Sequence, residues 1–102
     1  MRQFEAFHNP VPAARKAAPF LVVLSSHHLR DLSEVVVAPA VNDACRALSD
    51  LELDVTIQDQ QTVLVVSELF SLRANTLKRR AGSIADREDD IRRALEKLFS
   101  GF

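Results

Sequence analysis

The sequence has one cysteine, two glycines and no tryptophan. The single thiol, Cys45, excludes an intramolecular disulfide and fits a reducing compartment, where we expect it to serve as a small buried apolar residue. The two glycines, Gly82 and Gly101, lie far apart in the chain, so the glycine-rich loops that cradle phosphate groups are absent.

The chain also lacks an excess of either charge and a long apolar run. It carries 13 Lys and Arg against 14 Asp and Glu, a net charge of -1, which disfavours a dedicated nucleic-acid-binding protein. Its longest apolar stretches, Phe20–Leu24 and Thr62–Val66, are far too short to cross a bilayer. Met1–Phe7 shows no signal peptide. We therefore expect a soluble, cytoplasmic protein in which residues 1–102 form one domain.

Alternating polar and apolar residues, together with short continuous apolar runs, predict a β-rich chain. Pro10 and Pro12 make the segment His8–Ala18 a loop. Five or six short strands followed by one helix describe a β-rich α+β fold, a small barrel or curled sheet with a helix attached. We expect these strands at Gln3–Phe7, Phe20–Leu24, Val35–Val37, Leu53–Gln58 and Thr62–Val66, with a weaker one within Leu69–Leu77.

Some of these segments carry more detailed expectations. Phe20–Leu24 is typical of a strand buried on both faces, and the strand that begins at Val35 should end at Pro39 and pair with it antiparallel. A turn at Asp59–Gln61 should close a hairpin. Asn42–Leu51 predicts a helical turn that begins at its asparagine.

The last eighteen residues, from Ala85, predict one amphipathic helix. Ser83 and Asp86 have the spacing of a capping box at its start. Its aromatic end leaves two interpretations open: the last core residues of the helix, or an exposed anchor for a partner. The expected apolar face consists of Ile84, Ile91, Leu95, Leu98 and Phe102, and the expected ion pairs are Glu88–Arg92 and Asp89–Arg93.

Three polar clusters contain residue types that occur at functional sites, and none favours an enzyme. His27 and His28 are adjacent, but no third histidine or cysteine lies at a ligand spacing, so we expect no metal and no cofactor. Ser25, His27 and Asp31 have the residue types of a nucleophilic triad, which are common in loops. The basic run Lys78–Arg80 precedes the acids that open the helix, and we interpret it as a solvated stretch that these neighbours balance.

The carboxyl-terminal residues resemble the end of the CcdB family of plasmid-maintenance toxins. That family carries an HRENDI-like motif where its helix begins and ends on an FWGI-like tail. The residues that carry the resemblance are Asp86-Arg87-Glu88-Asp89-Asp90-Ile91, Ala94-Leu95 and Leu98-Phe99-Ser100-Gly101-Phe102. Gln3-Phe4, Phe20-Leu21-Val22-Val23 and Val36-Val37-Ala38-Pro39 fall in matching order, so the resemblance covers nearly the whole chain.

The resemblance implies the toxin of a type II toxin–antitoxin system, folded as an SH3-like antiparallel barrel of the CcdB/MazF/Kid type with a C-terminal α-helix. Such a toxin is a homodimer without enzymatic activity that binds the A subunit of DNA gyrase. A CcdA-like antitoxin neutralises it through a flexible tail, and it contacts neither nucleic acid nor membrane directly. The implied gyrase-binding residues are His28, Leu29, Glu96, Phe99, Ser100, Gly101 and Phe102, and the implied dimer interface contains Leu98, Phe99 and Phe102.

The chain departs from the family pattern at three of these positions. Ser100 stands where the family has its tail tryptophan, His28 replaces an apolar loop residue, and Glu96 replaces an uncharged polar one. Two alternatives therefore stay open. One is an mRNA endoribonuclease of the MazF/Kid type, in which His27, His28 and Arg30 would supply a general base and cationic groups. The other is a non-toxic relative that still binds an antitoxin.

Overall fold

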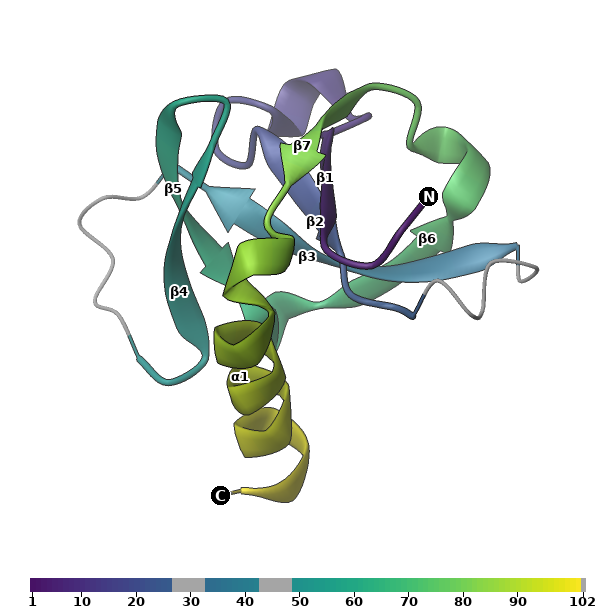
Figure 1. Cartoon of the computed structure of the whole chain (residues 1–102). Coiled ribbons are helices and arrows are strands. Elements are labelled where there is room, and N and C mark those ends of the chain that lie inside the picture. Colours follow the sequence, from purple (N-terminus) through teal and green to yellow (C-terminus); the bar gives the residue numbers. More distant parts are fainter. Residues whose placement is uncertain (27–32, 43–48, 102) are drawn as a thin grey trace.

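A computed structural model describes residues 1–26, 33–42 and 49–101, which form a curled antiparallel sheet followed by one α-helix (Figure 1). The strand order is β4-β5-β3-β2-β1-β7, and β6 pairs with β3 beside β5. The expected β-rich α+β architecture is confirmed. The strands are β1 (Glu5–His8), β2 (Phe20–Val23), β3 (Glu34–Val41), β4 (Glu52–Ile57), β5 (Gln60–Val65), β6 (Phe70–Arg73) and β7 (Arg80–Ser83), and the helix is α1 (Glu88–Ser100).

The curl of the sheet brings its two end strands, β4 and β7, towards each other. Short 3-10 turns occupy Pro12–Ala14 (η1), Val66–Glu68 (η3), Ala74–Thr76 (η4) and Ala85–Arg87 (η5). The guanidinium of Arg87, in the turn after β7, donates a hydrogen bond to the backbone oxygen of Asp54 in β4, at 2.5 Å. This contact ties the start of the helix to the far end of the sheet.

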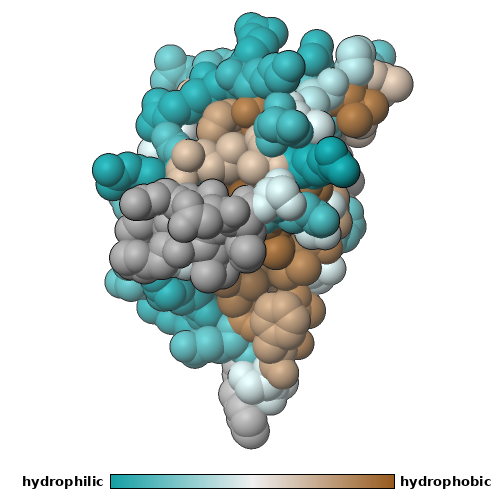
Figure 2. Space-filling model, turned by 90° about the vertical axis from the view of Figure 1, so that its right-hand side faces the viewer, coloured by the Kyte–Doolittle hydropathy of each residue, from teal (hydrophilic) through white to brown (hydrophobic). Residues whose placement is uncertain are grey.

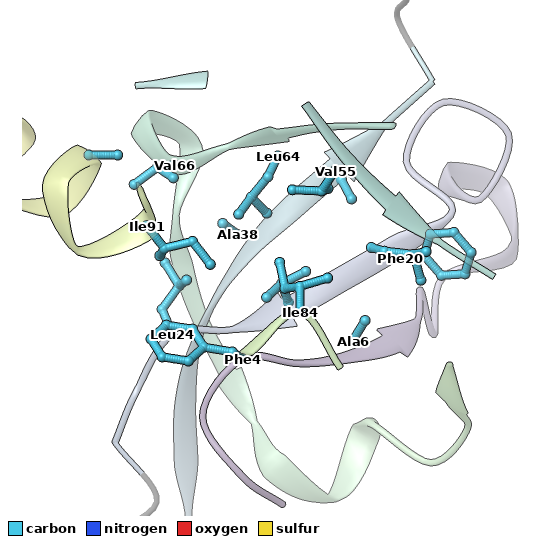
Figure 3. Packing of buried hydrophobic residues seen from close by; sticks show 14 residues of the cluster. Phe4, Ala6, Phe20, Leu24, Ala38, Val55, Leu64, Val66, Ile84 and Ile91 are labelled. Atoms are coloured by element: carbon cyan, nitrogen blue, oxygen red, sulfur yellow. The ribbon is translucent and has the colours of Figure 1, made fainter. Parts of the chain in front are cut away.

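Strand β2 is buried on both faces, as its continuous apolar sequence predicts. Phe20 and Val22 point into the main core cluster inside the curl, whereas Leu21 and Val23 join a second cluster on the other face. In Figure 3, Ile91 reaches from α1 into the main cluster beside Val66, and Phe20 closes its far end. The core therefore includes the helix, which makes α1 an integral part of the fold.

Strand β3 continues through Pro39, so the expectation that proline ends this strand is wrong. Leu24 N–H donates to Val36 O, and the alternation of an antiparallel ladder then turns the nitrogen of Pro39 away from β2. On that opposite edge β3 pairs with β6 up to Val37 and with β5 from Ala40. Pro39 lies in the gap between these partners, where no ladder hydrogen bond is lost.

The predicted hairpin is confirmed as β4 and β5, with its turn one residue earlier than expected. Ile57 pairs with Gln60, so Gln58 and Asp59 form a two-residue connection. Both have positive φ values, 53° and 61°, which is the backbone of a type I′ turn. Because side chains other than glycine, asparagine and aspartate rarely adopt this region, sequence alone did not locate the turn.

The amino-terminal strand and its neighbour differ from the sequence-based expectation. The first strand begins at Glu5 and not at Gln3, because Phe4 takes a φ of 70° and interrupts the extended backbone. β7 was missed altogether: Arg80, interpreted as part of a solvated basic run, pairs across from β1 and forms an ion pair with Glu5. The helical acids are therefore not the partners of Arg80.

The start of α1 also differs from the predicted capping box. Ser83 Oγ accepts a hydrogen bond from the N–H of Ala85, the first residue of the 3-10 turn, at 3.2 Å, while the α-helix begins at Glu88 without a side-chain cap. The Glu88–Arg92 ion pair is present at 3.4 Å. Arg93 pairs with Asp90 at 3.5 Å, so the expected pair with Asp89 is wrong. Three acids in the first turn and Lys97 in the last match the helix dipole.

Candidate functional site

The carboxyl half of α1 extends away from the sheet and ends in solvent (Figure 1). Ile91 and Ala94 are buried against the core, and Leu95 and Leu98 are half-buried at its margin. The next aromatic, Phe99, has a relative exposure of 74%, the largest among the exposed large apolar residues of the described chain. Of the two interpretations of this end, the structure therefore excludes Phe99 as a core residue.

Specific contacts fix the geometry of the helix end. Gly101 has a φ of 75°, the left-handed conformation that ends many helices, and its N–H donates to Lys97 O at 3.0 Å. Ser100 Oγ donates to Glu96 O at 2.5 Å, so its hydroxyl is occupied within the helix. Lys97 Nζ lies 3.2 Å from Asp50 Oδ2, which holds the last turn against the loop before β4. These three contacts define the conformation of the carboxyl end of α1.

An apolar band runs along α1 towards its carboxyl end. Figure 2 shows it as a continuous strip of apolar side chains that descends beside the helix. Leu69, which follows the η3 turn packed against α1, and Leu95 and Leu98 form its half-buried part. Phe99 forms its exposed end. An exposed aromatic that continues a core margin is typical of a protein-binding surface.

The structure brings together some of the implied gyrase-binding residues. Glu96, Phe99 and Ser100 are exposed neighbours on the last turn of α1, and Gly101 follows directly. Leu98, implied in the dimer interface, lies beside them and is half-buried. His28, Leu29 and Phe102 lie outside the described residues, as do His27, Arg30 and Asp31 of the other candidate clusters and most of the helical turn expected at Asn42–Leu51.

A second feature, which sequence reasoning missed, is a cationic cavity of about 500 Å³ at the opposite end of the molecule from the helix tip. It lies between the end of β1, the loop that follows it and the segment before β7. Its described lining includes three cationic side chains and no carboxylate. The lining residues are His8, Pro10, Arg15, Thr76, Lys78 and Arg79.

All three residues of the basic run Lys78–Arg80 are exposed to solvent as expected, but within the described residues none of them pairs with the helical acids. Within the described ranges, no carboxylate lies at ion-pair distance from the side chain of Lys78 or Arg79. They face Arg15, which is distant in sequence. No local signal could reveal this, because the juxtaposition depends on the β1–β7 pairing.

The cationic side chains of the cavity affect the pKa of the His8 imidazole. Burial lowers the pKa of His8 below its ordinary value, and the positive charges of Arg79 and Arg15 lower it further. The ring contacts Phe20 at a centroid distance of 5.4 Å. Among residues 1–26, 33–42 and 49–101, no group of three His, Cys, Asp or Glu side chains is placed to hold a metal ion. No helix in the same ranges is long and apolar enough to cross a membrane.

Comparison with known families decides the affiliation. The family model described as CcdB protein matches residues 3–101. The chain belongs to the CcdB family. The matched range includes all the described strands and the whole of α1, and it ends at Gly101, where the helix is capped. No match was found among curated proteins.

Solved structures share the fold of this CcdB-family chain. One, titled Crystal structure of Mtb toxin, is 22% identical with a TM-score of 0.70, over 92% of this chain and 99% of that one. Another, Mycobacterium tuberculosis toxin MazF-mt6, is also 22% identical, with a TM-score of 0.71 over 97% of both chains. At this identity they establish the fold alone, a curled antiparallel sheet with a carboxyl-terminal helix. The support for a toxin comes from membership of the CcdB family.

Proposed function

We propose that this chain is the toxin of a type II toxin–antitoxin system that binds the A subunit of DNA gyrase through the carboxyl end of α1. Membership of the CcdB family supports a binding protein without catalysis. The observation that carries the proposal is the 74% exposure of Phe99 on a capped helix end. The ring lies at the end of the apolar strip along α1, and an exposed aromatic in such a position is the kind of residue that anchors protein contacts.

The same surface supports a homodimer. Leu69, Leu95 and Leu98 form an apolar margin that one small core leaves half-open, and Phe99 extends it outward. A twofold contact along this strip would bury the margin and place two helix ends side by side, one self-complementary patch for a symmetric target. Ser100 and Glu96 would lie on the exposed side of that patch.

The antitoxin is expected to be a CcdA-like protein with a flexible segment that folds onto the toxin. Binding to the native toxin alone would raise its unfolding temperature with antitoxin concentration. The protein encoded by the adjacent reading frame is the natural candidate for this titration. An unchanged unfolding temperature at a tenfold molar excess of that protein would contradict this part of the proposal.

One pair of assays separates gyrase inhibition from RNA cleavage. We expect the purified toxin to inhibit supercoiling by gyrase and to leave a mixed-sequence mRNA intact. The variant Phe99→Ser should lose inhibition, while Val11→Ser, at an exposed apolar residue far from α1, should keep it. Cleavage of the mRNA with unimpaired supercoiling would instead support the endoribonuclease, whose candidate groups His27, His28 and Arg30 lie outside the described residues.

A further inference from the structure

We propose that the cationic cavity lined by His8, Arg15, Lys78 and Arg79 binds the phosphate group of a nucleotide. The site lies away from the helix end, so the inference does not depend on gyrase binding. Its volume of about 500 Å³ exceeds what a bare phosphate ion needs and falls within the usual range for small-molecule sites.

The near-zero net charge of the chain hides a segregation of its charged residues. Residues 9–20 carry Arg15 and Lys16 and no acid, and residues 69–80 carry Arg73 and Lys78–Arg80 and no acid. Residues 49–61, which include the β4–β5 hairpin, carry four acids and no base. The two basic segments meet at the cavity, so the argument from net charge against an anionic ligand does not hold locally.

The cationic groups are positioned by backbone contacts and not by acids. Arg15 Nε donates to Asn9 O at 2.6 Å, which fixes the guanidinium and leaves its other N–H donors available. His8 N–H donates to Arg79 O at 2.8 Å, which fixes the backbone of Arg79 beside β1. Thr76 Oγ1 donates to Arg73 O at 2.6 Å and closes the turn before Lys78. These contacts fix the Arg15 guanidinium and the backbone from which the exposed side chains of Lys78 and Arg79 extend, with no described carboxylate among the lining residues.

An anion in the cavity would find three cationic groups around it and no described carboxylate to repel it. Arginine guanidinium groups match phosphate oxygens in a bidentate geometry, and a lysine adds a point charge. Beside these groups, Pro10 and the half-buried ring of His8 offer flat surfaces on which a base can stack. Cations and flat surfaces together favour a nucleotide over a simple anion.

The pKa of His8 reports the occupancy of the cavity. Arg79 and Arg15 lower it, Phe20 packs against the ring, and Gln58 Nε2 lies 3.4 Å from Nε2. A bound phosphate offsets the two guanidinium charges and raises the pKa of His8 towards its ordinary value. Nuclear magnetic resonance measures this shift on the ring protons, and the signal of His8 is assigned by its loss in His8→Gln.

The test uses the full chain with uridine 5′-monophosphate, inorganic phosphate, a seven-nucleotide single-stranded RNA and a seven-residue polyglutamate peptide. Calorimetry should detect binding of the nucleotide. Arg79→Gln or Lys78→Gln should weaken the affinity for the nucleotide on the order of tenfold. Arg93→Gln is the matched control, since it removes the same charge at an exposed site on α1. At a nucleotide concentration near the dissociation constant of the parent, the pKa of His8 should rise more in the parent and in Arg93→Gln than in Arg79→Gln or Lys78→Gln.

The four probes make the proposal falsifiable. Tighter binding of the RNA than of the mononucleotide identifies a nucleic-acid chain as the source of the phosphate, and equal affinity identifies a free nucleotide. Binding of polyglutamate without the nucleotide would overturn the proposal in favour of an acidic protein segment. Inorganic phosphate that binds as tightly as the nucleotide, no binding of any probe at 5 mM, or an effect of Arg93→Gln equal to that of Arg79→Gln would also overturn it.

Discussion

The guanidinium carbon of Arg92 lies 5.8 Å from the centroid of the Phe4 ring. Phe4 is buried in the main core despite its left-handed backbone, and Arg92 covers it from α1. Glu88 holds the guanidinium from one turn earlier, at 3.4 Å. A cation over an aromatic face thus joins the helix to the residue that precedes β1.

We expect Arg92→Gln to destabilise the protein by about 0.5–1 kcal/mol, because the variant loses the cation over the ring and the exposed pair with Glu88. Urea unfolding measures the change. Arg93→Gln is the control, since its side chain is 75% exposed and its ion pair with Asp90 is long, so its loss should cost little. Equal losses in the two variants would show that the Phe4 contact contributes nothing.

The hairpin turn offers a stabilising substitution. Asp59 has a φ of 61°, a region that glycine adopts without steric cost. Asp59→Gly should therefore stabilise the protein by about 0.5 kcal/mol, after the larger entropy of the unfolded glycine chain is subtracted. Asp54→Gly, within β4, should destabilise it instead, because glycine weakens a strand interior. Thermal unfolding of both variants tests the sign, and destabilisation by Asp59→Gly would refute the argument.

Glu5 makes the folding stability of the protein depend on pH in the acid range. Burial raises its pKa, but hydrogen bonds from the Arg80 side chain and the Arg2 N–H outweigh burial, so the pKa lies below the ordinary 4.5. A lowered carboxyl pKa stabilises the folded state fully above the unfolded value, and this contribution is lost as the pH falls through the folded value. The stability of the parent should thus fall below about pH 4.5 in part because of Glu5.

Two variants isolate this contribution. Glu5→Gln should flatten the fall in stability below pH 4.5, measured by urea unfolding between pH 3 and 7. Arg80→Met removes the side-chain hydrogen bond that lowers the pKa of Glu5, so the folded pKa should rise towards the unfolded value and the fall in stability below about pH 4.5 should shrink, as in Glu5→Gln. Identical pH profiles for Arg80→Met and the parent would exclude the ion pair as the cause.

The features with a local sequence signal were predictable. β2 follows from five consecutive apolar residues, and the β4–β5 hairpin follows from alternation on either side of a polar turn. α1 follows from its apolar spacing and from the order of acid and base. Exposure of Phe99 could be weighed but not decided, since it depends on how far α1 extends beyond the sheet.

The features without a local sequence signal were not predictable. β7 is four residues with a glycine and an arginine, and it is a strand because β1 pairs with it and Glu5 neutralises Arg80. Pro39 interrupts no ladder only because β3 changes partners beside it. The cationic cavity likewise exists because the pairing of β1 with β7 brings Arg79 to Arg15. The strand β7, the position of Pro39 and the cavity all depend on pairing between strands that are distant in sequence. The spacing of residues along the chain does not indicate such pairing.

The dimer prediction rests on Phe99. We expect the parent to sediment at micromolar concentration at twice its monomer mass of 11.4 kDa. Phe99→Ser should weaken association by 30-fold or more, the scale of an aromatic hot spot, and leave the unfolding free energy of the monomer nearly unchanged because the ring is 74% exposed. Val11→Ser removes a 54% exposed apolar side chain away from α1 and should not affect association. A parent that sediments only as the monomer would contradict the prediction.

We expect Ser100 to limit the affinity of the proposed contact with gyrase. Its hydroxyl donates to Glu96 O, so the side chain offers a target neither a free donor nor much contact area. An indole at this position on the capped last turn would supply both area and an N–H donor. Ser100→Trp should therefore strengthen binding to a gyrase A fragment by roughly 30-fold, as measured by calorimetry. Ser100→Ala, which removes only the internal hydrogen bond, should bind like the parent.

The double variant Phe99→Ser with Ser100→Trp separates the dimer contact of Phe99 from the target contact of the introduced tryptophan. If the target needs both helix ends, loss of the dimer should cancel the gain in affinity from the tryptophan. If Ser100→Trp binds no better than the parent, gyrase contacts a different surface of this chain or is not its target.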